Sequence, residues 1–141
     1  MNKSRAAACC LLVLTTGVVA AQEIGKSTSS GVFTEEQAKR GAAAYNANCG
    51  VCHGSDLLST DREVSNLTGG AFQRWTGKTV AELFEVTRDT MPPKEERSLD
   101  DQIYLDIVTY ILRFNKIPAG NEELKPDLSI LRQMVITAPP G

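Results

Sequence analysis

Histidine is nearly missing from this sequence, since among 141 residues it occurs only at position 53. A structural zinc site commonly takes four cysteine or histidine ligands. Once the N-terminal segment described below is removed, only Cys49, Cys52 and His53 remain of these two types. The sequence therefore excludes a structural zinc site, and it excludes any metal centre that needs two histidines from one chain.

The sequence also lacks an excess of positive charge, and after residue 21 it lacks a long apolar run. Lys3 and Arg5 precede the apolar residues 6–20, and residues 19–21 offer a signal-peptidase site. This pattern predicts a secretory signal peptide over residues 1–21, too short to remain as a membrane span. Removing Lys3 and Arg5 from the 15 basic residues leaves 13 against 17 acidic ones, a net charge of −4. Such a chain is not suited to nucleic acid or to an anionic membrane.

The remaining chain fits a single small domain. Residues 22–33 are small, polar and glycine-containing, which predicts a flexible lead-in. Residues 34–117 form the predicted domain, and residues 118–141 form a tail expected to pack on it. No internal repeat is visible. Cys9 and Cys10 precede most of the apolar run of the signal, so we expect no lipidation there and expect both to be lost on cleavage.

The motif Cys49-Gly50-Val51-Cys52-His53 carries the chemistry. A C-x-x-C-H run is the attachment signature of c-type haem. In a helical segment the two thiols lie on one face and can bond the two vinyl groups, while the next histidine becomes the proximal iron ligand. A disulfide or a redox dithiol remains an alternative. A disulfide would leave His53 unexplained, and no strand-rich segment precedes Cys49 as a thioredoxin-type dithiol requires.

Three segments carry helix signals. Each begins with a threonine or serine that has an acidic or amide residue three positions later, and apolar residues follow at helical spacing. The pairs are Thr34 with Gln37, Thr79 with Glu82, and Ser98 with Asp101. The second helix must end before Pro92, because the residue before a proline is displaced from the helical region. The third, ended by Pro118 and Gly120, has the broadest apolar face.

The sixth iron ligand is inferred by exclusion. With no second histidine, the candidates are the methionine sulfurs of Met91 and Met134. Met91 precedes Pro92-Pro93, and two prolines stiffen a loop that can hold a weak thioether. Met134 lies in an apolar run, where flexible core packing is its natural role. We therefore predict Met91 as the distal ligand, with an open iron position as the alternative.

Trp75 is the only tryptophan. Large aromatic side chains are mostly buried, so packing in the core is its expected role. The alternative is that its indole N–H donates to a haem propionate, with Arg74 nearby as a charge partner.

Four features together resemble a monohaem class I c-type cytochrome, over roughly residues 34–116. They are the C-x-x-C-H motif, Met91-Pro92, the Gly41/Tyr45 face of the first helix, and the Ile107–Ile111 face of the last. The resemblance implies an all-α cytochrome c fold of three to five helices around one covalent haem c and its iron. It also implies that the first and last helices cross near Gly41 and Tyr110. Many family members carry a proline after the haem motif whose carbonyl accepts from the proximal histidine, but no proline stands between His53 and Met91.

The resemblance implies an exported, periplasmic one-electron carrier rather than an enzyme. It would accept electrons from a dehydrogenase or a quinol-oxidising complex and pass them to an oxidase, since His/Met ligation raises the potential. The Thr90-Met91-Pro92-Pro93 segment is also similar to cytochrome subunits of PQQ-dependent dehydrogenases, so the chain is expected as a monomer or as such a subunit. The alternative is a haem-based small-ligand sensor with an open sixth position. A peroxidase would need a distal acid or base, which the absence of a second histidine disfavours.

Overall fold

The computed structural model describes residues 25–138, so the predicted signal peptide, with Cys9 and Cys10, lies outside the described residues. The described residues form two short strands, one 3-10 helix and six α-helices. In chain order these are β1 (Lys26–Ser27), η1 (Thr28–Ser30), α1 (Glu35–Asn48), α2 (Gly50–His53), α3 (Gly70–Gln73), α4 (Val80–Thr90), α5 (Asp101–Phe114), α6 (Leu128–Leu131) and β2 (Met134–Val135). The predicted all-α cytochrome c fold is confirmed.

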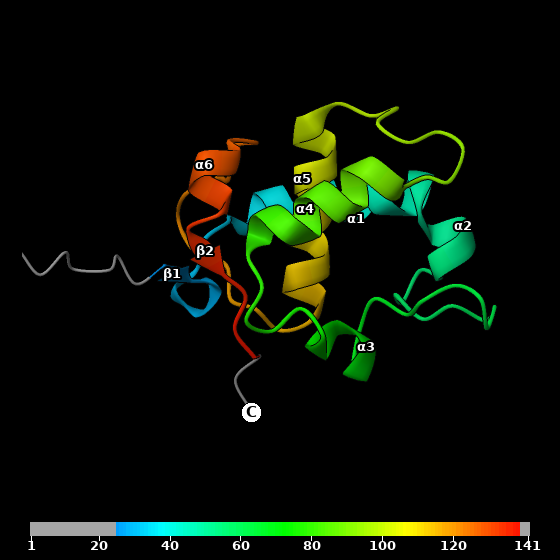
Figure 1. Ribbon diagram of the computed structural model, residues 1–141, viewed down its shortest axis with the longest axis horizontal. Helices are drawn as coiled ribbons and strands as arrows, with labels where there is room; N and C mark the ends of the chain where they lie inside the picture. Colours follow the sequence, from blue (N-terminus) through cyan, green and yellow to red (C-terminus); the bar gives the residue numbers. More distant parts are fainter. Residues whose placement is uncertain (1–24, 139–141) are drawn as a thin grey trace, which may run out of the picture.

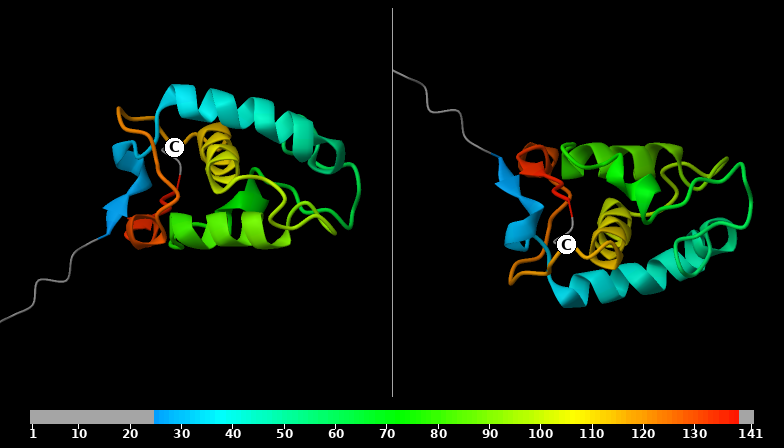
Figure 2. Two further views of the ribbon diagram at one scale, coloured as in Figure 1. Left: turned by 90° about the horizontal axis from the view of Figure 1, so that it is seen from above. Right: turned by 90° about the horizontal axis from the view of Figure 1, so that it is seen from below.

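Helix α5 lies in the middle of the molecule, with α1 and α2 along one side and α4 along the other (Figure 1 and Figure 2). Its central residues Leu105, Ile107, Val108 and Leu112 are buried, so the broad apolar face of the sequence packs on both neighbours. Helix α1 crosses α5 at Gly41. A Cβ atom built on Gly41 would lie 2.5 Å from the Asp106 carbonyl carbon and would also overlap the Asp106 oxygen. The crossing that the resemblance implied is therefore present.

The starts of the helices follow the sequence signals in part. The Thr34 side chain accepts from the Gln37 backbone N–H at 3.1 Å, but the Gln37 side chain does not reach back and instead contacts Asp106. Thr79 and Glu82 form the complete capping box that the spacing predicts. The last helix begins at Asp101 with Asp100 as N-cap, so the prediction of a start at Ser98 is wrong. Ser98 is instead held in the preceding turn, where its N–H donates to the Glu95 carbonyl at 3.2 Å.

Residues 25–33 differ from the flexible lead-in that the sequence predicts. Strand β1 pairs in parallel with β2, more than 100 residues later, with Lys26 opposite Met134. Thr28 and Phe33 are fully buried. The composition of this segment predicts flexibility, because a local pattern cannot show a pairing partner that is distant in the chain. The pairing covers the side of the core opposite to α2, where Figure 1 places β1, β2 and α6 together.

The tail after α5 returns along the same side of the molecule. Leu124, Leu131 and Ile136 are buried in the core. The Ile136 N–H donates to the Lys78 carbonyl, and its carbonyl accepts from the Gly77 N–H, both at 2.8 Å. Within residues 25–138, no helix has the length and apolar character needed to cross a membrane.

Candidate haem-binding site

Helix α2 is a single helical turn that carries the C-x-x-C-H motif. Cys49 ends α1 and begins α2, and its carbonyl accepts from the N–H groups of Cys52 and His53 at 3.1 and 3.0 Å. The motif is therefore helical, as the attachment of two neighbouring thiols requires. Cys49 is half-buried and Cys52 is exposed, and no disulfide joins them. Val51 between them is 91% exposed and points into solvent, whereas Cys49 packs against the core.

The pKa of the Cys49 thiol is raised to about 11, first by burial and then by the neighbouring Cys52. A thiolate is the reactive form of cysteine, and redox-active C-x-x-C pairs carry a thiol whose pKa is lowered. Cys49 is thus protonated at neutral pH. This thiol lacks the activation that a redox dithiol needs, which weakens that alternative interpretation of the motif.

The His53 ring is held by one backbone carbonyl. Its Nδ1 atom lies 3.0 Å from the carbonyl oxygen of Ser65. Because a carbonyl oxygen can only accept a hydrogen bond, Nδ1 is the donor, and Nε2 is the ring nitrogen left for a metal. Metal-bound histidines commonly donate their second ring N–H in this way, which sets the ring orientation and raises ligand basicity. Ser65 thus supplies the carbonyl that could not be identified from the sequence.

The loop that carries Ser65 is tied to the last helix. The Leu67 N–H donates to the Leu57 carbonyl at 2.9 Å and closes the loop at its base. The Leu67 carbonyl in turn accepts from Asn115 Nδ2 at the end of α5, also at 2.9 Å. Leu57 is fully buried beneath the loop. The sequence of this stretch, residues 54–70, predicts only turns, but in the structure it is a loop anchored at its base and to α5.

Helix α1 holds the backbone just after the histidine. The buried Tyr45 side chain donates its hydroxyl to the Gly54 carbonyl at 2.8 Å. Its ring packs on Tyr110 of α5, with the ring centroids 5.2 Å apart. Burial raises the pKa of Tyr45, so the hydroxyl remains a donor at neutral pH. The sequence marks Tyr45 only as part of an apolar face, and its contact with the motif depends on the fold.

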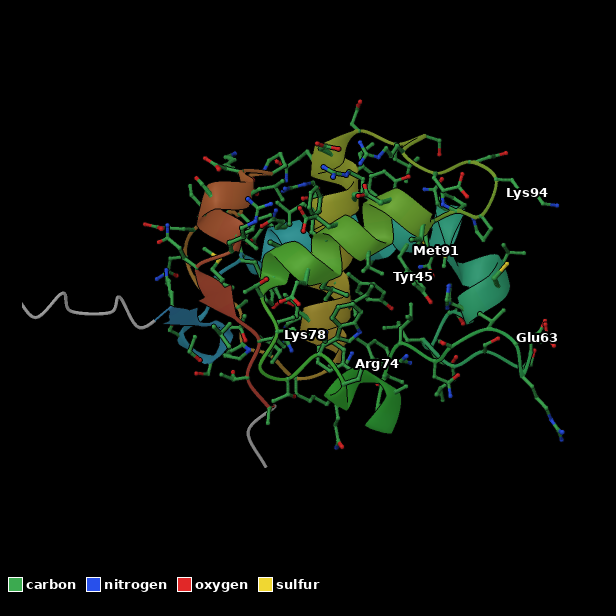
Figure 3. The ribbon with its side chains drawn as sticks, in the orientation of Figure 1. Tyr45, Glu63, Arg74, Lys78, Met91 and Lys94 are labelled. Atoms are coloured by element: carbon green, nitrogen blue, oxygen red, sulfur yellow. The ribbon has the colours of Figure 1, made fainter. Side chains whose placement is uncertain are left out.

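Met91 ends α4, at the end of that helix nearer to α2 (Figure 3). Its N–H donates to the Thr87 carbonyl at 3.2 Å, and its carbonyl accepts from the Tyr104 hydroxyl at 2.8 Å. Both backbone groups are thus held by the protein, while the side chain is only half-buried. Met134, by contrast, is buried in β2 at the opposite end of the molecule from α2 (Figure 1).

Trp75 follows α3 and is half-buried against the core. Lys78 Nζ lies 5.8 Å from the centroid of its ring, within the range of a cation–π contact. The Arg74 Nε atom donates to the Ala71 carbonyl at 2.7 Å. Lys78 therefore places positive charge beside the indole, whereas the Arg74 side chain is bonded back to α3.

The residues present fit a covalent c-type haem. Two thiols that are not bonded to each other and one imidazole with a free Nε2 lie on a single turn. A thioether with exposed surface lies at the same end of the molecule. These are the atoms that haem attachment and His/Met ligation use. A groove of about 440 Å³ between α1 and α5, lined by Lys39 and Phe114 among others, is a separate feature. Neither the two cysteines of the motif, nor His53, nor Met91 lines it.

Comparisons with known proteins bear on the identity of this fold. A family model described as "Cytochrome C oxidase, cbb3-type, subunit III" matches residues 36–111, more than half of the chain. The matched region begins in α1 and ends in α5, and so includes the helix crossing and α2. Comparison with the curated proteins gave no match, and comparison with the solved structures gave none. The chain therefore belongs to this family of c-type cytochrome domains.

Proposed function

We propose that this chain is an exported one-electron carrier with one covalently attached haem c. Cys49 and Cys52 form the two thioether bonds, His53 Nε2 is the proximal ligand and Met91 Sδ is the distal ligand. When bound, the haem iron supplies the one-electron redox couple. The roles of the protein are to hold the two ligands, to cover the cofactor with apolar side chains and to limit water.

The hydrogen bond between His53 Nδ1 and the Ser65 carbonyl carries the proposal. It leaves Nε2 as the only ring atom able to bind a metal, and it does so directly beside two thiols. A histidine that only packs in the core or lies on the surface would not be expected to have both a fixed Nδ1 hydrogen bond and two neighbouring thiols. Tyr45 supports it further, because its bond to Gly54 holds the backbone that follows the histidine.

The position of Met91 supports a distal role. Its backbone is held by Thr87 and Tyr104, so the thioether is presented from an anchored point. A ligand that keeps its place in both oxidation states keeps the rearrangement on electron transfer small. The burial of Met134 in β2, at the other end of the molecule, supports a packing role for that residue.

Trp75 is proposed as a contact for a haem propionate. The positive charge of Lys78 beside its ring would favour a carboxylate there, and Arg74, the preceding residue, adds a second positive charge to the segment. Charge-assisted hydrogen bonds are about twice as strong as neutral ones. The alternative role for Trp75 is packing, which its half-burial against the core also fits.

Export to the periplasm and the identity of the partners also belong to this proposal. A dehydrogenase or a quinol-oxidising complex would be the donor, and an oxidase would be the acceptor. The description of the matched family names a subunit of an oxidase, which supports a place in an electron-transfer chain. A permanent position as the cytochrome subunit of a dehydrogenase is the second form of the same proposal.

The test is the mass of the exported protein. We expect a chain that begins at about Gln22 with the added mass of one haem, and we expect acid–acetone to leave that haem attached. Cys52→Ala should leave at most one thioether, whereas Val51→Ala, at the exposed position between the thiols, should retain both. Haem that acid–acetone extracts, or a Cys49–Cys52 disulfide in the holoprotein, would contradict the proposal.

A further inference from the structure

The proximal histidine belongs to a closed ring of hydrogen bonds in the loop that follows it. Ser59 Oγ donates to the Cys52 carbonyl, and the Ser59 N–H donates to Asn66 Oδ1, both at 2.9 Å. Asn66 shares a peptide group with Ser65, whose carbonyl accepts from His53 Nδ1. His53 is bonded covalently to Cys52, and this closes the ring. We propose that Ser59 and Asn66 are positioning residues that set the hydrogen bond of His53 and, through it, the reduction potential.

This inference rests on the proposed function, because it takes His53 as the proximal ligand. The ring itself is a feature of the protein alone. It joins the segment before the histidine to the segment that supplies its acceptor, although Ser65 lies 12 positions after His53 in the chain. Ser59 bridges the two segments through both its side chain and its backbone.

The other contacts of the loop do not replace this bridge. The Leu57–Leu67 backbone bond closes the base of the loop. The Ser65–Asn66 peptide lies inside that closure, where its carbonyl could rotate away from His53. Ser65 and Asn66 are both exposed, so packing does not hold the peptide either. The Asn66 side chain is the contact that resists this rotation, because it anchors the peptide to Ser59.

The sign of the effect on the potential follows from the chemistry of imidazole. A histidine that donates its Nδ1 proton to a carbonyl is a more basic ligand at Nε2. A more basic ligand stabilises the oxidised iron and lowers the potential. Weakening the ring should therefore raise the potential. A loop that merely loosened and admitted water would act in the opposite direction, because water favours the more highly charged oxidised form.

The experiment uses the reduced holoprotein, in which NMR follows the exchange of the His53 Nδ1 proton with deuterium. Ser59→Ala and Asn66→Ala should each speed this exchange by about fivefold to tenfold, the equivalent of one hydrogen bond. Both variants should also raise the reduction potential. Ser59→Thr and Asn66→Asp keep the hydroxyl and the acceptor, so both should exchange at the wild-type rate.

A control in the same loop is Asp61→Ala. It removes the side-chain acceptor of the Glu63 N–H, a bond of 2.8 Å outside the ring. It keeps the Asp61 backbone N–H, which donates to Ser59 Oγ at 3.0 Å, and should therefore leave the exchange rate unchanged. Unchanged exchange in both alanine variants of the ring, or a lowered potential in them, would overturn the inference. The wild-type spectrum tests the proposed function separately. If the His53 ring protons lack the strong upfield shift of a haem ligand, the ligand assignment fails whatever the variants do.

Discussion

At the scale of single residues, the proposed ligand Met91 is what separates an electron carrier from a binder of small ligands. A thioether on the iron leaves no position for an external ligand, whereas an open position would make the chain a binder of small ligands. The side chain is half-buried, and its backbone is held independently by Thr87 and Tyr104. Shortening the side chain should therefore remove the ligand without displacing the loop.

We expect Met91→Ala to convert a carrier into a binder. The oxidised protein should lose the weak far-red sulfur-to-iron absorption band, its potential should fall, and the reduced protein should bind carbon monoxide rapidly. Absorption spectroscopy and a redox titration measure these changes. The potential should fall because a thioether ligand favours reduced iron.

Met134→Ala is the matched control for Met91→Ala. Its side chain is 7% exposed, so it should lose about 2–5 kcal/mol of stability while the spectrum and potential stay close to wild type. An exchange of outcomes between the two variants would move the axial assignment to Met134. An unchanged spectrum in both would mean that methionine does not bind the iron, and would favour the sensor alternative.

At the scale of elements, the crossing of α1 and α5 is the contact on which the site depends. It brings Tyr45 against Tyr110 and allows Tyr45 to reach Gly54 beside the histidine. The helices approach this closely because Gly41 has no side chain. A displacement at Gly41 should thus be transmitted to α2, one turn beyond Tyr45.

We expect Gly41→Ala to lower the free energy of unfolding of the holoprotein by about 1–3 kcal/mol. Its Cβ would meet the Asp106 backbone and the Tyr110 Cβ, 3.0 Å away, and backbone cannot move aside cheaply. Alanine is the better helix former by about 1 kcal/mol, so a loss would show that the clash outweighs propensity. Thermal or denaturant unfolding gives the measurement.

Gly70→Ala provides the comparison for Gly41→Ala. Gly70 is also helical, but a Cβ there would meet nothing within 4 Å. This variant should be neutral or slightly more stable. If Gly41→Ala behaves in the same way as Gly70→Ala, then the crossing tolerates a side chain and the argument from close approach is wrong.

At the scale of the whole molecule, one buried side chain joins three distant segments. Gln37 of α1 donates through Nε2 to Asp106 of α5 and to the Leu124 carbonyl of the tail, both at 3.0 Å. Its Oε1 accepts from the Leu124 N–H at 2.9 Å. Arg40 adds a partly exposed ion pair to Asp106 and another to Glu123 in the tail. The tail is therefore part of the cooperative fold.

We expect Gln37→Leu to destabilise the protein by about 3 kcal/mol, because it leaves the buried Leu124 N–H without a partner. The Leu124 carbonyl would keep only the longer bond of 3.4 Å from Gln102 Nε2. The tail should loosen first, which hydrogen exchange of the Leu124 amide would detect. Gln133→Leu removes a single exposed bond to the Ser129 carbonyl and should change stability by no more than about 0.5 kcal/mol. Equal stability of the two variants would contradict the role given to Gln37.

Much of this protein follows from local sequence. The C-x-x-C-H motif, the Thr79–Glu82 capping box and the end of α4 before Pro92 each depend on residues a few positions apart. Their geometry comes from one helical turn or from the restriction that proline imposes, so no distant contact is needed. The apolar face of α5 is also determined locally, because helical periodicity alone places its apolar residues on one side of the helix.

The tertiary structure decided the features whose partners are far apart in the chain. The Gln37 side chain bonds Leu124 of the tail instead of the start of its own helix. Residues 26–27, expected to be part of a flexible lead-in, pair with β2. The Ser65 carbonyl became the partner of His53 because the closed loop brings it back to the histidine. A polar group forms its hydrogen bond with the partner that packing brings close, and that partner can be far away in the sequence. The local pattern of residues therefore does not predict it.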